Sequence, residues 1–141
     1  MKKPALVDAN VVLRYLLADD AQQSPEAAAL FAKAPAGSLH LTTIIVAEVG
    51  WVLLSHYKVP RDQVALALQR VIAQPSVYAD TVTIEAVTRF SATKLDLGDC
   101  VLAAQAWHDQ CDIVTFDKDF QRFRDITTLG AKAALARLHN S

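Results

Sequence analysis

Four acidic residues interrupt or close apolar runs of the sequence: Asp8, Glu48, Asp99 and Asp117. A carboxylate among apolar residues is costly unless a positive charge compensates it. If the fold brings the four together, the natural compensator is a divalent cation with hard oxygen ligands, such as Mg²⁺ or Mn²⁺. Such a cation can polarise a phosphodiester oxygen and lower the pKa of a bound water. The residues therefore favour metal-assisted phosphodiester hydrolysis.

Each of the four acids also has a simpler explanation. Asp8 and Asp99 could act only as caps at helix starts, where the helix dipole favours a carboxylate. Asp117 could lie in a solvated turn, and Glu48 could be a single exposed residue within a helix. The joint placement of the four, rather than any one position, favours a shared site.

Three further polar residues are candidates for supporting roles. Asp96 could join the acidic group, cap the helix that follows it, or be solvated. Asn10 could fix Asp8 through a side-chain hydrogen bond, although an asparagine near a helix start often caps only locally. Thr115 could offer its hydroxyl to the acids or to a bound water, or simply pack within a strand.

Short apolar strands alternate with longer helical segments, which is typical of a parallel sheet covered by helices. The sequence therefore predicts one three-layer α/β domain over residues 1–141, with a central, mostly parallel sheet of about five short strands. We predict strands at 5–7, 39–41, 77–78, 112–116 and 126–129, and helices at 9–18, 25–34, 43–57, 60–72, 84–93, 100–108 and 131–138.

This arrangement directs the acids toward one place. In an open parallel sheet the reactive crevice lies beyond the carboxyl ends of the strands. Asp8 and Asp117 both follow predicted strands, so we expect them to face that crevice together. Asp99 lies at a predicted helix start. Glu48 lies about one turn into its helix, close enough to the preceding strand end for us to expect its side chain at the same crevice.

The composition is that of an ordinary globular protein, with 52% hydrophobic and 21% charged residues among 141. The formal net charge of −1 excludes overall positive charge as a basis for nucleic-acid binding, so any basic surface must be local. The four histidines are scattered, which argues against a zinc site. We expect both cysteines to be small core residues of a reduced, cytoplasmic protein. We also expect three aromatic residues to pack in the core and not to stack on bases: Trp51, Trp107 and Phe116.

Four segments, each with one of the acids, resemble the motifs of PIN-domain proteins of the VapC toxin type: Val7–Leu16, Val46–Leu53, Asp96–Ala106 and Val114–Phe120. The resemblance covers roughly residues 6–129, with a core at 4–129 and a C-terminal extension at 130–141. It implies a Mg²⁺- or Mn²⁺-dependent endoribonuclease, a toxin of a type II toxin–antitoxin pair. It also implies a cognate VapB-type antitoxin and a homodimer.

The resemblance assigns the metal to the same acids. Asp8 and Asp99 are the expected ligands, and Glu48 and Asp117 bind the metal directly, through water, or position the nucleophile. Two other functions remain open from the sequence. A PIN-like module could bind RNA or protein without cutting, whereas a phosphatase that forms an aspartyl phosphate would need a second aspartate at the position of Asn10.

Overall fold

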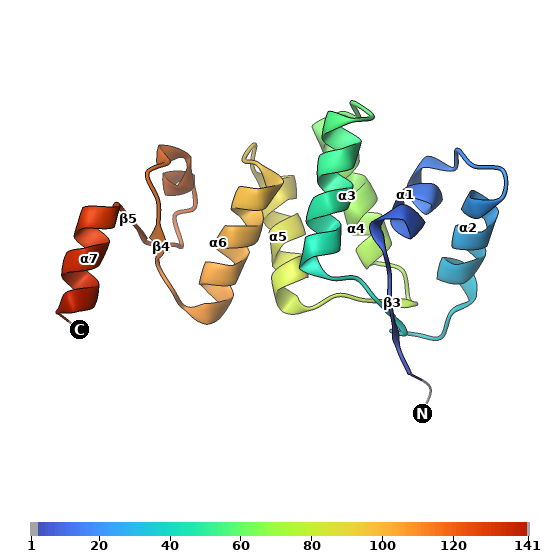
Figure 1. The fold of residues 1–141 in the computed structure, drawn as a ribbon, viewed down its shortest axis with the longest axis horizontal. Coiled ribbons are helices and arrows are strands. Elements are labelled where there is room, and N and C mark those ends of the chain that lie inside the picture. Colours follow the sequence, from blue (N-terminus) through green and yellow to red (C-terminus); the bar gives the residue numbers. More distant parts are fainter. Residues whose placement is uncertain (1–2, 141) are drawn as a thin grey trace.

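A computed structural model describes residues 3–140 and confirms the α/β class (Figure 1). Helices and short strands alternate along most of the described chain. In order, the elements are β1 (Ala5–Leu6), α1 (Ala9–Leu17), α2 (Gln23–Lys33), β2 (Leu39–His40), α3 (Thr43–Ser55), α4 (Arg61–Ile72), β3 (Val77–Tyr78), α5 (Thr81–Ala92), α6 (Leu97–Asp109), β4 (Ile113–Val114), a 3-10 helix η1 (Lys118–Arg122), β5 (Thr128–Leu129) and α7 (Ala131–His139).

The strands pair in parallel, as predicted, but they form two sheets instead of one. The first has the order β1-β2-β3, with Ala5 opposite Leu39 and Leu39 opposite Val77. The second has only β4 and β5, with Ile113 opposite Thr128. Figure 1 shows β4 and β5 on the far side of α6 from the first sheet. An apolar run predicts that a strand exists, but it does not determine which other strand pairs with it.

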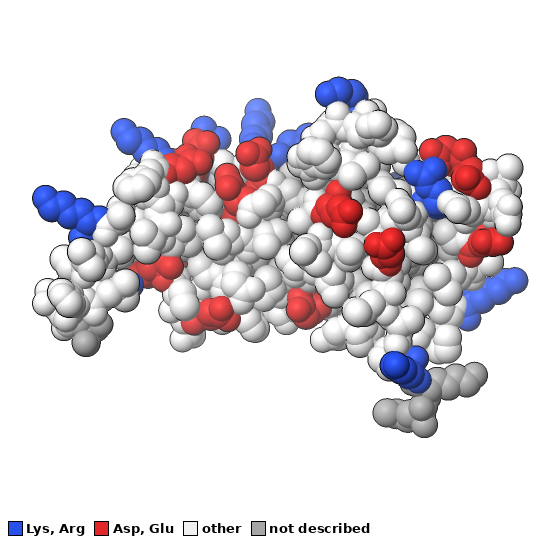
Figure 2. Space-filling view, viewed as in Figure 1, with Lys and Arg blue, Asp and Glu red and all other residues white. Residues whose placement is uncertain are grey.

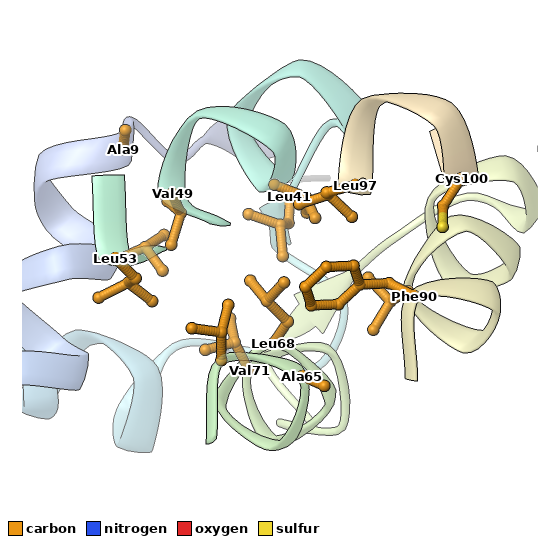
Figure 3. Packing of buried hydrophobic residues seen from close by; sticks show 14 of the residues in the cluster. Ala9, Leu41, Val49, Leu53, Ala65, Leu68, Val71, Phe90, Leu97 and Cys100 are labelled. Atoms are coloured by element: carbon orange, nitrogen blue, oxygen red, sulfur yellow. The ribbon is translucent and has the colours of Figure 1, made fainter. Parts of the chain in front are cut away.

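The main core lies among the helices. Val49 and Leu53 of α3, Leu68 of α4 and Phe90 of α5 are each at most 2% exposed and point into one apolar interior (Figure 3). Leu97, the first residue of α6, joins them. α5 packs along α6, and α3 packs against α1, α4, α5 and α6. Helix α3 is therefore the element that links the N-terminal helices to α6.

Three helices, α2, α5 and α6, start earlier than predicted, and for α2 and α5 an aspartate ahead of the helix bonds to its start. The Asp80 carboxylate accepts a hydrogen bond from the Thr83 backbone N–H, so α5 begins at Thr81 instead of near residue 84. The Asp20 carboxylate accepts from the backbone N–H of the two residues before Ser24, so α2 begins at Gln23. Ser24, which directly precedes the predicted helix start at residue 25, therefore lies inside α2.

Several residues expected in the core lie at the surface. Cys100 is buried, but Cys111 is exposed. The side chains of Trp51, Trp107 and Phe116 are 66%, 43% and 88% exposed. These predictions were wrong because an apolar side chain predicts burial only where another element covers it. No described helix is both long and apolar enough to cross a membrane.

Candidate active site

Asp8 lies two residues after the end of β1 and occupies the N-cap position of α1. Its backbone carbonyl accepts hydrogen bonds from the N–H groups of Val11 and Val12. Its exposed carboxylate makes no capping hydrogen bond. The chain therefore turns into α1 at Asp8 without using its side chain, so the carboxylate is available to a ligand.

Glu48 lies in the second turn of α3 and is exposed. Ile44 and Trp51, four residues before it and three after it, share its face of the helix and are 74% and 66% exposed. Helix α3 is apolar on nearly every face, which is typical of a helix covered all round. The face that carries Glu48 is nevertheless open in this chain.

The start of α6 carries Asp96 at the N-cap and Asp99 in the first turn. The Asp96 carbonyl accepts from the N–H of Cys100, and its carboxylate makes no capping hydrogen bond. Partial burial raises the pKa of Asp99, and the nearby charges of Asp96, Asp117 and Asp119 raise it further. The helix dipole at this position favours the ionised form, so partial burial first, and the crowded carboxylates second, must outweigh it to raise the pKa of Asp99.

The loop that leads to α6 is fixed from α4. The Arg61 Nη2 donates to the carbonyls of Phe90, Thr93 and Leu95 at 2.9, 3.0 and 2.6 Å. The guanidinium carbon also lies 3.9 Å from the centre of the Phe90 ring. Arg61 therefore closes the end of α5 and holds the backbone immediately before Asp96.

Asp117 occupies the N-cap of η1, after β4, and is exposed. Its Oδ1 accepts from the Asp119 N–H at 2.9 Å, while its own N–H donates to the Thr115 hydroxyl at 2.9 Å. The turn expected as the simpler explanation is therefore present, and Thr115 supports Asp117. Asp119, which the sequence analysis missed, joins the acids near Asp99; only its position two residues after Asp117 could have indicated it.

Asn10 does not support Asp8, because no hydrogen bond joins the two among residues 3–140. It lines a cavity of about 340 Å³ between α1 and α2, together with Arg14, Glu26 and Leu30. The cavity is lined mainly by apolar surface and contains none of the four predicted acids. Asn10 therefore belongs to a different surface of α1.

The structure thus does not bring the four predicted ligands together. Asp96, Asp99, Asp117 and Asp119 form what we call the acidic cluster, whose charges act on Asp99. The carboxylates of Asp8 and Glu48 are not among those that raise its pKa. Figure 2 shows the acidic side chains of this face in several separate patches.

The acidic residues fit a divalent cation in their chemistry, because carboxylate oxygens are the ligands that Mg²⁺ and Mn²⁺ prefer. They do not fit it in their placement. Within residues 3–140, no group of three or more His, Cys, Asp or Glu side chains is arranged to hold a metal ion. A metal centre built from Asp8, Glu48, Asp99 and Asp117 would need the strand ends of both sheets to come together.

Comparison with known proteins adds one finding. A family model described as PIN domain matches residues 5–126, a range that contains all four predicted acids. A search of curated proteins found no match. The matched range also contains the first sheet, β4 and η1, and it ends two residues before β5 begins.

Proposed function

Because the PIN-domain model matches most of its length, this chain belongs to the PIN-domain family, and we propose that it is an endoribonuclease that depends on Mg²⁺ or Mn²⁺. PIN domains are in general metal-dependent nucleases. The observation that carries the proposal is that one family match spans the four acids, each located just after a strand or in the first turns of a helix. Non-catalytic binding would not require all four.

The proposed roles follow the position of each acid. With the strand ends of both sheets brought together, Asp8 and Asp99 would hold the cation, which would supply charge stabilisation to the phosphodiester. Glu48 and Asp117 would complete the ligand set or orient the attacking water. A carboxylate that accepts a hydrogen bond from this water can also take its proton. In this role Asp117 would use the oxygen that Asp119 leaves free.

We further propose that the chain is the toxin of a type II toxin–antitoxin pair, neutralised by a VapB-type antitoxin. A basic side chain of the antitoxin, most simply an arginine, would bind the carboxylates in the place of the cation. Added Mg²⁺ should then weaken inhibition by the antitoxin. An inhibitor that binds equally well to an Asp99→Asn variant would contradict this mechanism.

The activity is tested with purified protein, a structured RNA and Mn²⁺ or Mg²⁺, with and without a chelator. We expect cleavage that the chelator abolishes. Asp8→Asn and Asp99→Asn should each lower the rate by ~100-fold or more, the range expected for loss of a positioned catalytic group. The matched control is Asp62→Asn, since Asp62 is an exposed first-turn aspartate of α4 and lies outside the acidic cluster.

The stability of the variants makes the result interpretable. Without a cation, Asp99→Asn should unfold at a temperature no lower than the wild type, because it removes one charge from a crowded cluster. Full activity in a folded Asp99→Asn variant would contradict the proposed site. RNA binding without any cleavage by the wild type would instead favour the non-catalytic module.

A further inference from the structure

The outer edge of β1 has unpaired backbone groups. Ala5 and Val7 donate their N–H groups to Ser38 and His40, so both face β2. Leu6, between them, therefore directs its N–H and C=O away from the sheet. Its side chain is 75% exposed. An open strand edge beside an exposed apolar residue readily pairs with another strand.

The outer edge of β4 is open in the same way. Ile113 and Thr115 donate their N–H groups to Thr127 and Leu129, so both face β5. Val114 therefore directs its backbone groups outward, and its side chain is 52% exposed. The sheets β1-β2-β3 and β4-β5 thus have open edges at β1 and at β4, and every pairing in both of them is parallel.

The two edges match in register. In a parallel pair of strands, some residues direct their backbone N–H and C=O toward the neighbouring strand. Each of these residues makes hydrogen bonds to the residues just before and just after the one that lies opposite it. Leu6 and Val114 both face outward, so Leu6 can lie opposite either neighbour of Val114, Ile113 or Thr115. We take the register with Leu6 opposite Thr115. That register places Asp8 opposite Asp117. Opposite residues project from the same face, so their carboxylates would be neighbours.

The β4 that meets β1 must come from another copy, because this chain holds its own β4 elsewhere. Figure 1 shows α3, α5 and α6 between β1 and β4. The β4–β5 unit (residues 110–129) is fixed to α5, where Arg89 donates two hydrogen bonds to Asp125, at 3.0 and 2.5 Å, and its guanidinium lies over Phe123. Phe120 and Phe123 are also buried. Closure within one chain would break these contacts.

The surfaces beside the two edges also suit each other. Ile44 and Trp51 are exposed near the Glu48 position of α3, and Phe116, two residues after the end of β4, is 88% exposed. Apolar exposure of this kind marks an interaction surface.

We infer that two copies of this chain pair edge to edge, with β1 of each copy against β4 of the other. Each paired sheet then has the order β3-β2-β1-β4-β5, with β4 and β5 from the second copy. Asp8 and Glu48 of one copy would join Asp99 and Asp117 of the other, so each site is shared between two chains. This explains why the described residues of one chain provide suitable ligands but no assembled metal site.

Cross-linking tests the pairing without any need for activity. One tagged chain carries Leu6→Cys and a second chain, with a different tag, carries Thr115→Cys, both with Cys111→Ser. A short bismaleimide should join the two chains into a product of twice the chain mass. Tyr78→Cys in place of Leu6→Cys is the matched control, because Tyr78 shares that face of the sheet but lies two strands away, on β3.

The outcomes separate the alternatives. A strong product with Leu6→Cys and a weak one with Tyr78→Cys would support the pairing. Equal products, or none, would overturn it. So would cross-linking within a single chain that carries both Leu6→Cys and Thr115→Cys, because that product requires closure in one copy.

Complementation tests the shared site and rests on the proposed nuclease function. Asp8→Asn and Asp117→Asn should each be inactive alone. When the two are co-expressed, about one quarter of wild-type activity should return, because half of randomly formed dimers are mixed and each has one complete site. Co-expression of Asp8→Asn with Glu48→Gln should restore nothing, since both acids come from the same side of the site.

Failure of the two proposals would look different. An inactive wild type that still cross-links through Leu6 and Thr115 would remove the nuclease function and leave the pairing intact. An active wild type with no recovery in the Asp8→Asn and Asp117→Asn mixture would overturn the shared site alone.

Discussion

Asp80 connects the start of α5 to α3 through a short series of hydrogen bonds. Its Oδ1 accepts from the backbone N–H and the hydroxyl of Thr83, at 2.9 and 2.7 Å. The Thr83 hydroxyl also lies 2.6 Å from that of Thr43. Because Thr83 is fully buried, Asp80→Ala should lower the free energy of unfolding by about 1–2 kcal/mol at neutral pH. Urea denaturation measures this loss.

The effect of Asp80→Ala should depend on pH. The Thr83 hydroxyl, and then its N–H, lower the pKa of Asp80 below the ordinary 3.8. The ionised carboxylate therefore stabilises the fold fully above pH 3.8, and this contribution is lost as the pH falls through the lower, folded-state pKa. The difference between variant and wild type should shrink over that acidic range. A difference independent of pH would contradict this cause.

Replacement of Arg61 should affect both the stability of the fold and, through the loop before Asp96, the nuclease activity. Arg61→Met would leave three backbone carbonyls without their cationic donor. We expect the free energy of unfolding to fall by about 2–3 kcal/mol and the nuclease rate to fall with it, since the loop before Asp96 would move. Thermal unfolding and RNA cleavage measure the two effects.

The matched control for Arg61 is Gln69→Ala. Gln69 also reaches from α4 to α5, where its side chain donates to Ser91 at 2.9 Å, but this pair is exposed. Its removal should change stability by less than about 0.5 kcal/mol and leave the rate unchanged. Equal losses in both variants would mean that Arg61 holds the two helices together without positioning the loop.

At the scale of elements, α3 and α6 approach each other closely at Gly50. A Cβ at this position would overlap the Leu97 side chain at the start of α6. Gly50→Ala should therefore cost about 1–3 kcal/mol and displace the first turn that carries Asp99. Gly98→Ala is the control, because a Cβ at Gly98 meets nothing within 4 Å. It should be neutral or stabilise α6 by up to about 1 kcal/mol.

Denaturation curves and RNA-cleavage rates of the Gly50→Ala and Gly98→Ala variants test whether a Cβ at Gly50 displaces the start of α6. A Gly50→Ala protein as stable and active as wild type would show that Leu97 adapts without moving α6. A Gly98→Ala protein that lost stability would mean that the first turn of α6 needs glycine for another reason.

The sequence predicted the elements themselves well, because each strand and helix depends on local patterns. The helix start at Thr81 was missed, since a single cap at Asp80 fixes it, and the 3-10 helix η1 was missed because its five residues carry no periodic pattern. The separation of β4 from β1 was also missed. Strand partners depend on contacts between distant segments, which apolar runs do not specify.

The candidate site was predictable only in part for the same reason. The acids were identified from their positions after strands and at helix starts, and Asp96, Asp99 and Asp117 do lie near each other. Their approach follows from short connections around α6. The approach of Asp8 and Glu48 depends on how the two sheets meet, which the sequence did not reveal.

For the whole molecule, a shared site makes activity depend on assembly. Cleavage per chain should stay constant at high protein concentration and fall as dimers dissociate on dilution. The midpoint of thermal unfolding should rise with concentration over the same range. Cleavage rates and light-scattering mass across a dilution series measure both. Constant activity per chain in a solution of monomers would contradict a site built from two copies.

Cys111 offers a way to follow this assembly in the unaltered protein. Of the two cysteines in the chain, Cys100 is buried and Cys111 is exposed, two residues before β4 begins. A maleimide dye should therefore label one position per chain, next to the strand edge in question. Energy transfer between donor- and acceptor-labelled chains would then report their association in real time, with no engineered thiol.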